Sequence, residues 1–351
     1  MQSSLFWIGA FIAIALVFDF LNGFHDASNI VATMIASRAM SPVQALVICS
    51  VCELVGPFVF GVAVATTIGH EVVAGAVISN SLILAALLSA IVWNVVTWYI
   101  GIPSSSSHAL VGGLAGSAFM TKLGLQLDQG ALQSMADLAA TVLVIRPGGF
   151  VKVLLSLLIS PPLGFLAGYV VIKLTYFFGR LASPRINWFF KRGQLVTSVA
   201  LALSHGANDA QKTMGVIAMA LFAGGFTQHF AVPWWVIALC AAAISAGTAS
   251  GGWRLIKTIG GKFYKIRPVH GFATQVSAGL LIIGASLVGG PVSTTHVVSS
   301  AVMGAGSGER LSKVRWGVGK QIVVAWIITI PVTAVLAAIF RLIIRSTSWA
   351  G

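Results

Sequence analysis

Asn22-Gly23-Phe24-His25-Asp26-Ala27 decides the fold of this chain, because a second copy of the motif follows 183 residues later. The second copy reads His205-Gly206-Ala207-Asn208-Asp209-Ala210, and its Gly, Asp and Ala coincide with those of the first. Another motif, Gly101-Ile102-Pro103-Ser104-Ser105-Ser106-Ser107-His108, returns 188 residues later as Gly289-Gly290-Pro291-Val292-Ser293-Thr294-Thr295-His296. Two motifs that recur in the same order at nearly the same offset indicate a duplicated chain.

Composition places the chain in a membrane. Charged residues make up 8% of its 351 residues and hydrophobic residues 57%, whereas an average soluble domain has about 25% charged residues. Most of the apolar runs approach the ~20 residues that cross a bilayer as a helix. We therefore predict an all-α polytopic protein of the cell membrane with about 10–12 membrane segments. The runs are 5–18, 43–68, 83–100, 150–178, 232–249, 272–288 and 321–340.

Charges in the loops indicate how the two halves are oriented. The predicted units are a first repeat over 1–178, a basic cytoplasmic linker over 179–194 and a second repeat over 195–351. Lys and Arg favour the cytoplasmic side of a membrane, and they gather in 253–267 and 305–320 but not in the corresponding loops of the first half. The halves are therefore expected to be inverted relative to each other.

Basic residues at both ends of 268–309 predict a segment that enters the membrane and returns to the same side. Its counterpart, 81–121, is expected to do so from the opposite face. Such broken helices are tolerated where the freed backbone lines a cavity or is buried in protein. One loop does not fit this scheme, because Arg146 and Lys152 lie where the outer face is expected.

Asp26 and Asp209 lie in or beside apolar runs, where an ionised carboxylate costs several kcal/mol or more unless it is paired or hydrated. Helices broken at corresponding places in two halves indicate a transporter site near the middle of the membrane. The alternative is that each Asp merely caps a helix. Glu53, a third acid within a span, is expected to bind a cation or proton or to pair with Lys212. The polar residues that accompany the two aspartates are His25, Asn29, Asn208, Gln211 and Lys212.

The hydroxyl runs Ser104–Ser107 and Ser293–Thr295 follow Gly-Pro breaks and precede Gly-rich helical stretches. They are therefore predicted to start helices, where free backbone N–H groups and the helix dipole favour an anion. Hydroxyl groups add donors that can surround a tetrahedral oxyanion. The alternative is ordinary N-capping, or contacts between helices. The predicted oxyanion-binding set is Ser104, Ser105, Ser106, Ser107, Gln211, Lys212, Ser293, Thr294 and Thr295.

These paired motifs resemble those of the inorganic phosphate transporter (PiT) family over nearly the whole chain. The resemblance implies an inverted-repeat fold that is usually dimeric, with phosphate held between the two hydroxyl runs. It implies that Asp26, Asn29, Asn208 and Asp209 hold the coupling cation, with Glu53 as an accessory acid. The motif containing His25 is similar to the bacterial branch associated with low-affinity phosphate uptake, either as the anion or as a neutral metal complex.

Two residues depart from the sodium-coupled pattern of that family. His25 stands where the pattern has Asn, and Lys212 stands where it has an Asn that aligns with Asn29. Because an ammonium can replace a bound sodium ion and a histidine can titrate, the departures favour proton coupling over sodium coupling. No other cofactor is expected, and the Cys49-x-x-Cys52 pair lies inside an apolar run without a second ligand pair, so no resident metal is expected either.

Four other functions are alternatives to phosphate symport. Sulfate carriage by the same fold remains open, since both anions are tetrahedral. A passive channel is a further alternative. A membrane hydrolase lacks a Gly-x-Ser-x-Gly elbow and gives no reason for each motif to occur twice, so no enzyme activity is expected. Nucleic-acid binding is disfavoured despite the formal charge of +13, because the basic residues lie in short loops rather than on one folded face.

Overall fold

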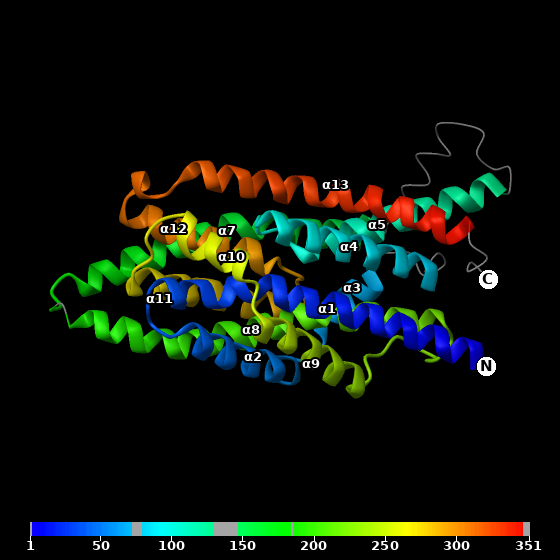
Figure 1. The fold of residues 1–351 in the computed structure, drawn as a ribbon, viewed down its shortest axis with the longest axis horizontal. Helices are drawn as coiled ribbons and strands as arrows, with labels where there is room; N and C mark the ends of the chain where they lie inside the picture. Colours follow the sequence, from blue (N-terminus) through cyan, green and yellow to red (C-terminus); the bar gives the residue numbers. More distant parts are fainter. Residues whose placement is uncertain (1, 72–78, 129–146, 184, 347–351) are drawn as a thin grey trace.

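The computed structural model describes residues 2–71, 79–128, 147–183 and 185–346, and these residues form helices and short connections without strands. The arrangement is shown in Figure 1. Ser41 and Ser79 cap their helices through side-chain oxygens. The helices are α1 (Gln2–Ala36), α2 (Pro42–Val59), α3 (Ala63–Glu71), α4 (Asn80–Ile100), α5 (Ser106–Asp128), α7 (Pro147–Gly179), α8 (Ile186–Ala223), α9 (Trp234–Ser250), α10 (Trp253–Lys257), α11 (Pro268–Leu287), α12 (Thr294–Glu309) and α13 (Trp316–Ser346), with a π-helical turn over Thr258–Lys262 and a 3-10 turn over Leu311–Lys313.

Six of the described helices are long and apolar enough to cross a membrane, and the number rises to seven if a pair bent by 58° over Trp234–Lys262 is one span. This count rests on length and composition alone, whereas the 10–12 segments expected from the sequence include broken helices. Of the four helices that carry the polar motifs, α1 is among the six, whereas α5, α8 and α12 are not. Large apolar side chains point outward instead, as at Leu166 (57% exposed) and Ile327 (68% exposed), which suits contact with lipid.

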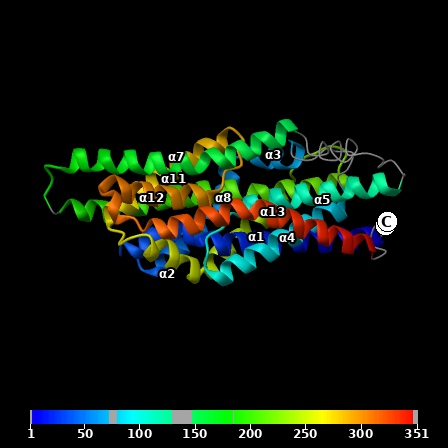
Figure 2. The ribbon, with the colours of Figure 1, turned by 90° about the horizontal axis from the view of Figure 1, so that it is seen from above.

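Two broken hairpins enter the protein from opposite ends, as predicted for 81–121 and 268–309. The pair α4 and α5 lies toward the end that carries both termini, and the pair α11 and α12 lies toward the other end (Figure 2). Each hairpin breaks at a glycine with positive φ, 78° at Gly101 and 68° at Gly289, a conformation that other residues adopt at a cost. Prolines two residues further on, Pro103 and Pro291, prevent either helix from continuing.

Contacts around the two halves occur in matched pairs. The Thr258 hydroxyl donates to the Gly101 carbonyl at 3.0 Å, and the Thr67 hydroxyl donates to the Gly289 carbonyl at 2.8 Å. α1 packs on α9 as α8 packs on α2. Residues of each half thus contact the other half at corresponding places.

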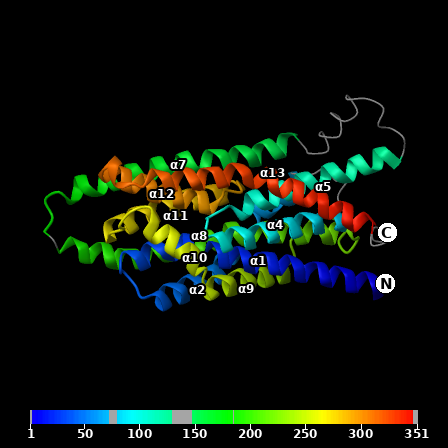
Figure 3. The same ribbon diagram turned by 45° about the horizontal axis from the view of Figure 1, so that its top comes forward.

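The glycines spaced four residues apart on α5 and α7 make close helix contacts. A Cβ on Gly112 or Gly116 would meet the α13 backbone at Ile330 or Ala334, while one on Gly164 or Gly168 would meet the α12 backbone. The end of α5 and the start of α7 lie toward the same end of the molecule (Figure 3). Of the two basic residues that did not fit the charge pattern, Arg146 lies outside the described residues and Lys152 lies on α7.

Candidate functional site

The two hydroxyl runs begin helices α5 and α12, as the sequence predicted. Ser105 Oγ accepts the His108 backbone N–H at 3.2 Å, and Ser293 Oγ accepts the His296 backbone N–H at 3.3 Å. The two histidine rings then lie against each other with their centroids 4.3 Å apart. The helix starts from the two halves therefore meet inside the protein.

The hydroxyl run of the first half is tied to the helices around it. The Ser104 hydroxyl donates to Thr97 Oγ1 at 2.8 Å, and the Ser106 hydroxyl donates to Asn22 Oδ1 at 2.6 Å. Asn22 lies one helical turn before Asp26 on α1. The Ser107 hydroxyl reaches the Val292 carbonyl at 3.5 Å, just before the second run. The start of α5 therefore contacts both α1, which carries Asp26, and the residues just before α12.

The hydroxyl run of the second half contacts the two motif aspartates directly. Thr295 Oγ1 donates to Asp26 Oδ1 at 2.8 Å and accepts from Asn29 Nδ2 at 3.0 Å. Thr294 Oγ1 lies 3.0 Å from Asp209 Oδ2 and 3.3 Å from Asp26 Oδ2, so its single proton is shared between them. The predicted anion site and the predicted coupling-ion site are thus contiguous.

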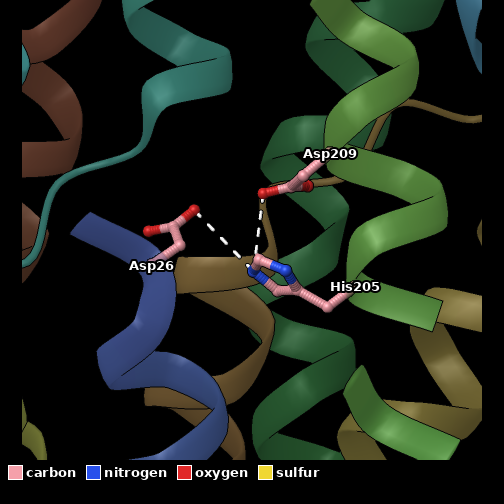
Figure 4. Close-up of side chains that lie close together, drawn as sticks. All are labelled: Asp26, His205 and Asp209. Atoms are coloured by element: carbon pink, nitrogen blue, oxygen red, sulfur yellow. Dashed lines mark ion pairs between the residues drawn. The ribbon is translucent and has the colours of Figure 1, made fainter. Parts of the chain in front are cut away.

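A cluster of ionisable side chains surrounds these aspartates, and we call Asp26, Glu53, His205, Asp209 and Lys212 the buried cluster. The His205 ring lies between the two aspartates (Figure 4), with Nε2 3.5 Å from Asp209 and 3.9 Å from Asp26. Its Nδ1 lies 2.6 Å from a Glu53 oxygen. Lys212 Nζ lies 2.5 Å from the other Asp209 oxygen. α1, α2 and α8 thus bring three acids, one lysine and one histidine together.

No member of the buried cluster is more than 1% exposed in this conformation. A buried charge is costly unless it is paired and hydrogen-bonded, and the cluster offers Lys212 and, when protonated, His205 to three carboxylates. One acid is left without a matching positive charge. The cluster can accept that charge as a proton or as a cation.

The remaining predicted residues lie at the edge of this cluster. His25 Nδ1 is 3.3 Å from Asp26 Oδ1, and the His25 ring also reaches Thr97. Asn208 Nδ2 donates to the Ser286 hydroxyl at 3.0 Å and so positions the connection before α12. Gln211 Oε1 accepts the Val64 backbone N–H at 2.8 Å at the start of α3, so that this oxygen faces α3 rather than the hydroxyl runs. Glu53 pairs with His205, not with Lys212 as one alternative supposed.

Sequence reasoning overlooked two members of this region. His205 was seen only as a polar neighbour of Asp209, since nothing in the sequence shows that Glu53 lies beside it. Asp19 was not considered, although it is fully buried on α1 and bonds to Thr213. The signal for Asp19 was available, because an acid in an apolar run has the same cost as at Asp26.

Helices broken at two opposed places around a buried polar site define a membrane transporter. Residues 22–337 match the phosphate transporter family, and the chain belongs to that family and transports phosphate. It is 41% identical to the "Probable low-affinity inorganic phosphate transporter" of Bacillus subtilis (strain 168), covering 94% of this chain and 95% of that protein. It is also 41% identical to the protein of that name from Rhizobium meliloti (strain 1021), covering 93% of each.

The fold has a counterpart among solved structures. A chain described as "The sodium-dependent phosphate transporter" superposes with a TM-score of 0.82 at 24% identity, covering 97% of this chain and 99% of that one. The likeness extends to nearly the whole of both chains. It confirms the all-helical transporter fold with broken helices that the motifs predicted.

Proposed function

We propose that the chain imports inorganic phosphate in symport with protons. The observation that carries this proposal is that the hydroxyl donors at the start of α12, which suit an anion, are bonded to the two motif aspartates. Thr294 and Thr295 donate to Asp26 and Asp209, yet their position at a helix N-terminus is where an anion is favoured. A phosphate that docks there takes these donors away from the two carboxylates.

Electrostatics then requires a positive charge to enter with phosphate. Two like charges about 4 Å apart repel by about 4 kcal/mol at the effective dielectric constant of a protein surface, and by more in its interior. The buried cluster already has more acids than matched cations. Phosphate binding is therefore expected to drive proton uptake by the carboxylates that lose their hydroxyl donors.

The contacts of Lys212 and His205 favour a proton over sodium. The Lys212 ammonium, 2.5 Å from Asp209, supplies there the charge that a sodium ion would supply. His205 lies within ion-pair distance of Glu53, Asp26 and Asp209. An imidazole among three carboxylates can hold a proton without moving any helix.

Transport requires the site to open alternately toward each side. The hairpins α4–α5 and α11–α12 approach the site from opposite ends of the molecule (Figure 2), and their tips meet at His108 and His296. Rocking of one half against the other, which is common in transporters with inverted repeats, would separate one hairpin from the site at a time. The inverted relation of the halves is part of this proposal.

A second candidate has a specific observation in its favour. Asp26, His205 and Asp209 offer atoms that all lie within 4.8 Å of one another, a spacing that could hold a cation. Sodium, or the divalent ion of a metal–phosphate complex, could neutralise phosphate there in place of protons. The solved structure with the same fold is described as sodium-dependent.

Uptake into proteoliposomes separates these candidates. We expect purified protein to accumulate phosphate under an acid-outside pH gradient, without sodium and with divalent ions chelated. Asp26→Asn and Asp209→Asn should abolish the pH-driven accumulation, whereas Asp128→Asn, outside the buried cluster, should leave it unchanged. Accumulation only with a sodium gradient or an added divalent ion would overturn proton coupling, and transport of sulfate in preference to phosphate would overturn the choice of anion.

A further inference from the structure

Asp19 is a buried carboxylate that the proposed mechanism does not yet use. It lies on α1 two helical turns before Asp26, about 10 Å along the helix axis, and is 0% exposed. One of its oxygens accepts a hydrogen bond from Thr213 at 2.9 Å. The other, Oδ2, has no hydrogen-bond partner among the described residues.

No cation in the described part of the chain balances Asp19. Among the described residues, no Lys, Arg or His lies within ion-pair distance of it. The titratable groups that face it are Asp209 on α8, Glu53 on α2 and the Cys240 thiol on α9, two of them acids and none of them basic. An isolated negative charge in this setting is costly, so a proton on the carboxyl, which removes that charge, is favourable.

The duplication shows that the fold does not require an acid at this position. At the offset that superposes Asp26 on Asp209, Asp19 falls on Ala202 of α8. Its partner Thr213 belongs to the second half, one helical turn beyond Asp209. Asp19 is therefore an addition to one half, placed where the two halves touch.

The charges of the loops assign a side of the membrane to Asp19. Arg38 follows α1, and the basic residues of 179–194 precede α8, so these ends face the cytoplasm. Asp19 lies before Asp26 on α1 and Thr213 lies after Asp209 on α8. Both are consequently displaced from the buried cluster toward the outer face.

We propose that Asp19 takes up the coupling proton from the outer side and passes it to the buried cluster. An outside proton forms an O–H bond on the Asp19 carboxylate when the outer path opens. That bond breaks as a carboxylate of the buried cluster, deprived of its hydroxyl donor by phosphate, takes the proton. Asp19 is again ionised until the next proton arrives, and no co-reactant other than water is needed.

This inference rests on proton-coupled phosphate transport, and the test keeps the two apart. Proteoliposomes containing wild type, Asp19→Asn, Asp19→Glu or Thr213→Val would be assayed for accumulation under a pH gradient. The same vesicles would be assayed for exchange of labelled against unlabelled phosphate at equal pH, which needs no net proton movement.

We expect Asp19→Asn to lose pH-driven accumulation by about a hundredfold, the smaller end of what a proton-transfer group contributes, while it still exchanges phosphate. Asp19→Glu and Thr213→Val keep a carboxyl and should keep accumulation. Wild type without pH-driven accumulation would overturn proton coupling itself. With wild type active, the role of Asp19 is overturned if Asp19→Asn still accumulates phosphate. It is also overturned if Asp19→Asn, Asp19→Glu and Thr213→Val all lose both accumulation and exchange.

Discussion

The Lys212 ammonium lies 2.5 Å from Asp209 Oδ1, and neither residue is more than 1% exposed. Removing one partner of a buried ion pair typically costs 3–5 kcal/mol because the other charge is left unpaired. Asn29, which aligns with Lys212 across the duplication, donates an amide hydrogen bond to Thr295 instead. The two halves thus supply an internal cation on one side of the site only.

We predict that Lys212→Asn makes phosphate uptake depend on sodium. The substitution restores the amide of the first half and leaves Asp209 without its cation, so an external cation should be recruited. The measurement is phosphate uptake at fixed pH with sodium chloride or choline chloride. Lys262→Asn, in the basic turn after α10, serves as the control. The prediction is contradicted if folded Lys212→Asn protein takes up phosphate equally well in sodium chloride and in choline chloride.

Gly206 and Gly23 are predicted to tolerate no side chain. A Cβ on Gly206 would lie 2.6 Å from the Glu53 carbonyl oxygen, and one on Gly23 would lie 2.1 Å from the Ile244 carbonyl oxygen. Because backbone cannot yield as a side-chain end can, Gly206→Ala should destabilise the protein by about 1–3 kcal/mol or more. Gly284→Ala, in α11 with nothing within 4 Å, is the matched control. Equal thermal unfolding temperatures for both variants would refute the close contact.

The duplicated motifs made much of this site predictable. Gly, Pro and hydroxyl residues have local meanings, so Gly101-Ile102-Pro103 already indicates a break and Ser105 a helix start. Basic loops then indicated that the two broken segments come from opposite faces. These inferences need no knowledge of which helices touch.

Pairing between distant residues could not be predicted in this way. Glu53 contacts His205, and Asp19 contacts Thr213, through helix packing that leaves no mark on either local sequence. The count of long apolar helices among the described residues falls below the predicted number of membrane segments for a related reason. Segments such as α8 are polar because they carry the site, and neighbouring helices rather than lipid cover them.

The hydroxyl of Thr295 is predicted to contribute directly to phosphate affinity. Thr295→Val should raise the phosphate concentration for half-maximal uptake about tenfold, since a hydrogen bond to a charged group contributes about 1.5 kcal/mol or more. Ser299→Ala is the control on the same helix, because the Ser299 hydroxyl is buried and has no described hydrogen-bond partner. An unchanged half-saturation value in Thr295→Val would exclude this hydroxyl from the phosphate site.

Glu309, the last residue of α12, should make stability depend on pH. It lies 2.5 Å from Arg267, 2.5 Å from His270 and 2.7 Å from Lys313. Burial raises the pKa of Glu309, but the hydrogen bonds from Lys313 and His270 and the charges of His270 and Arg267 outweigh burial and hold it at about 2. An unfolded glutamate has a pKa of about 4.3.

Because the folded pKa is the lower one, Glu309 stabilises the protein fully above about pH 4.3, and this stabilisation is lost as the pH falls toward about 2. Glu309→Gln should therefore be less stable than wild type at pH 7, by about 1 kcal/mol since the side chain remains partly in solvent. Thermal unfolding of both proteins in detergent between pH 7 and pH 3 measures the difference. The difference in stability between the two proteins should narrow steadily below about pH 4.3. A difference that stays constant down to pH 3 would show that these contacts do not depend on the Glu309 charge.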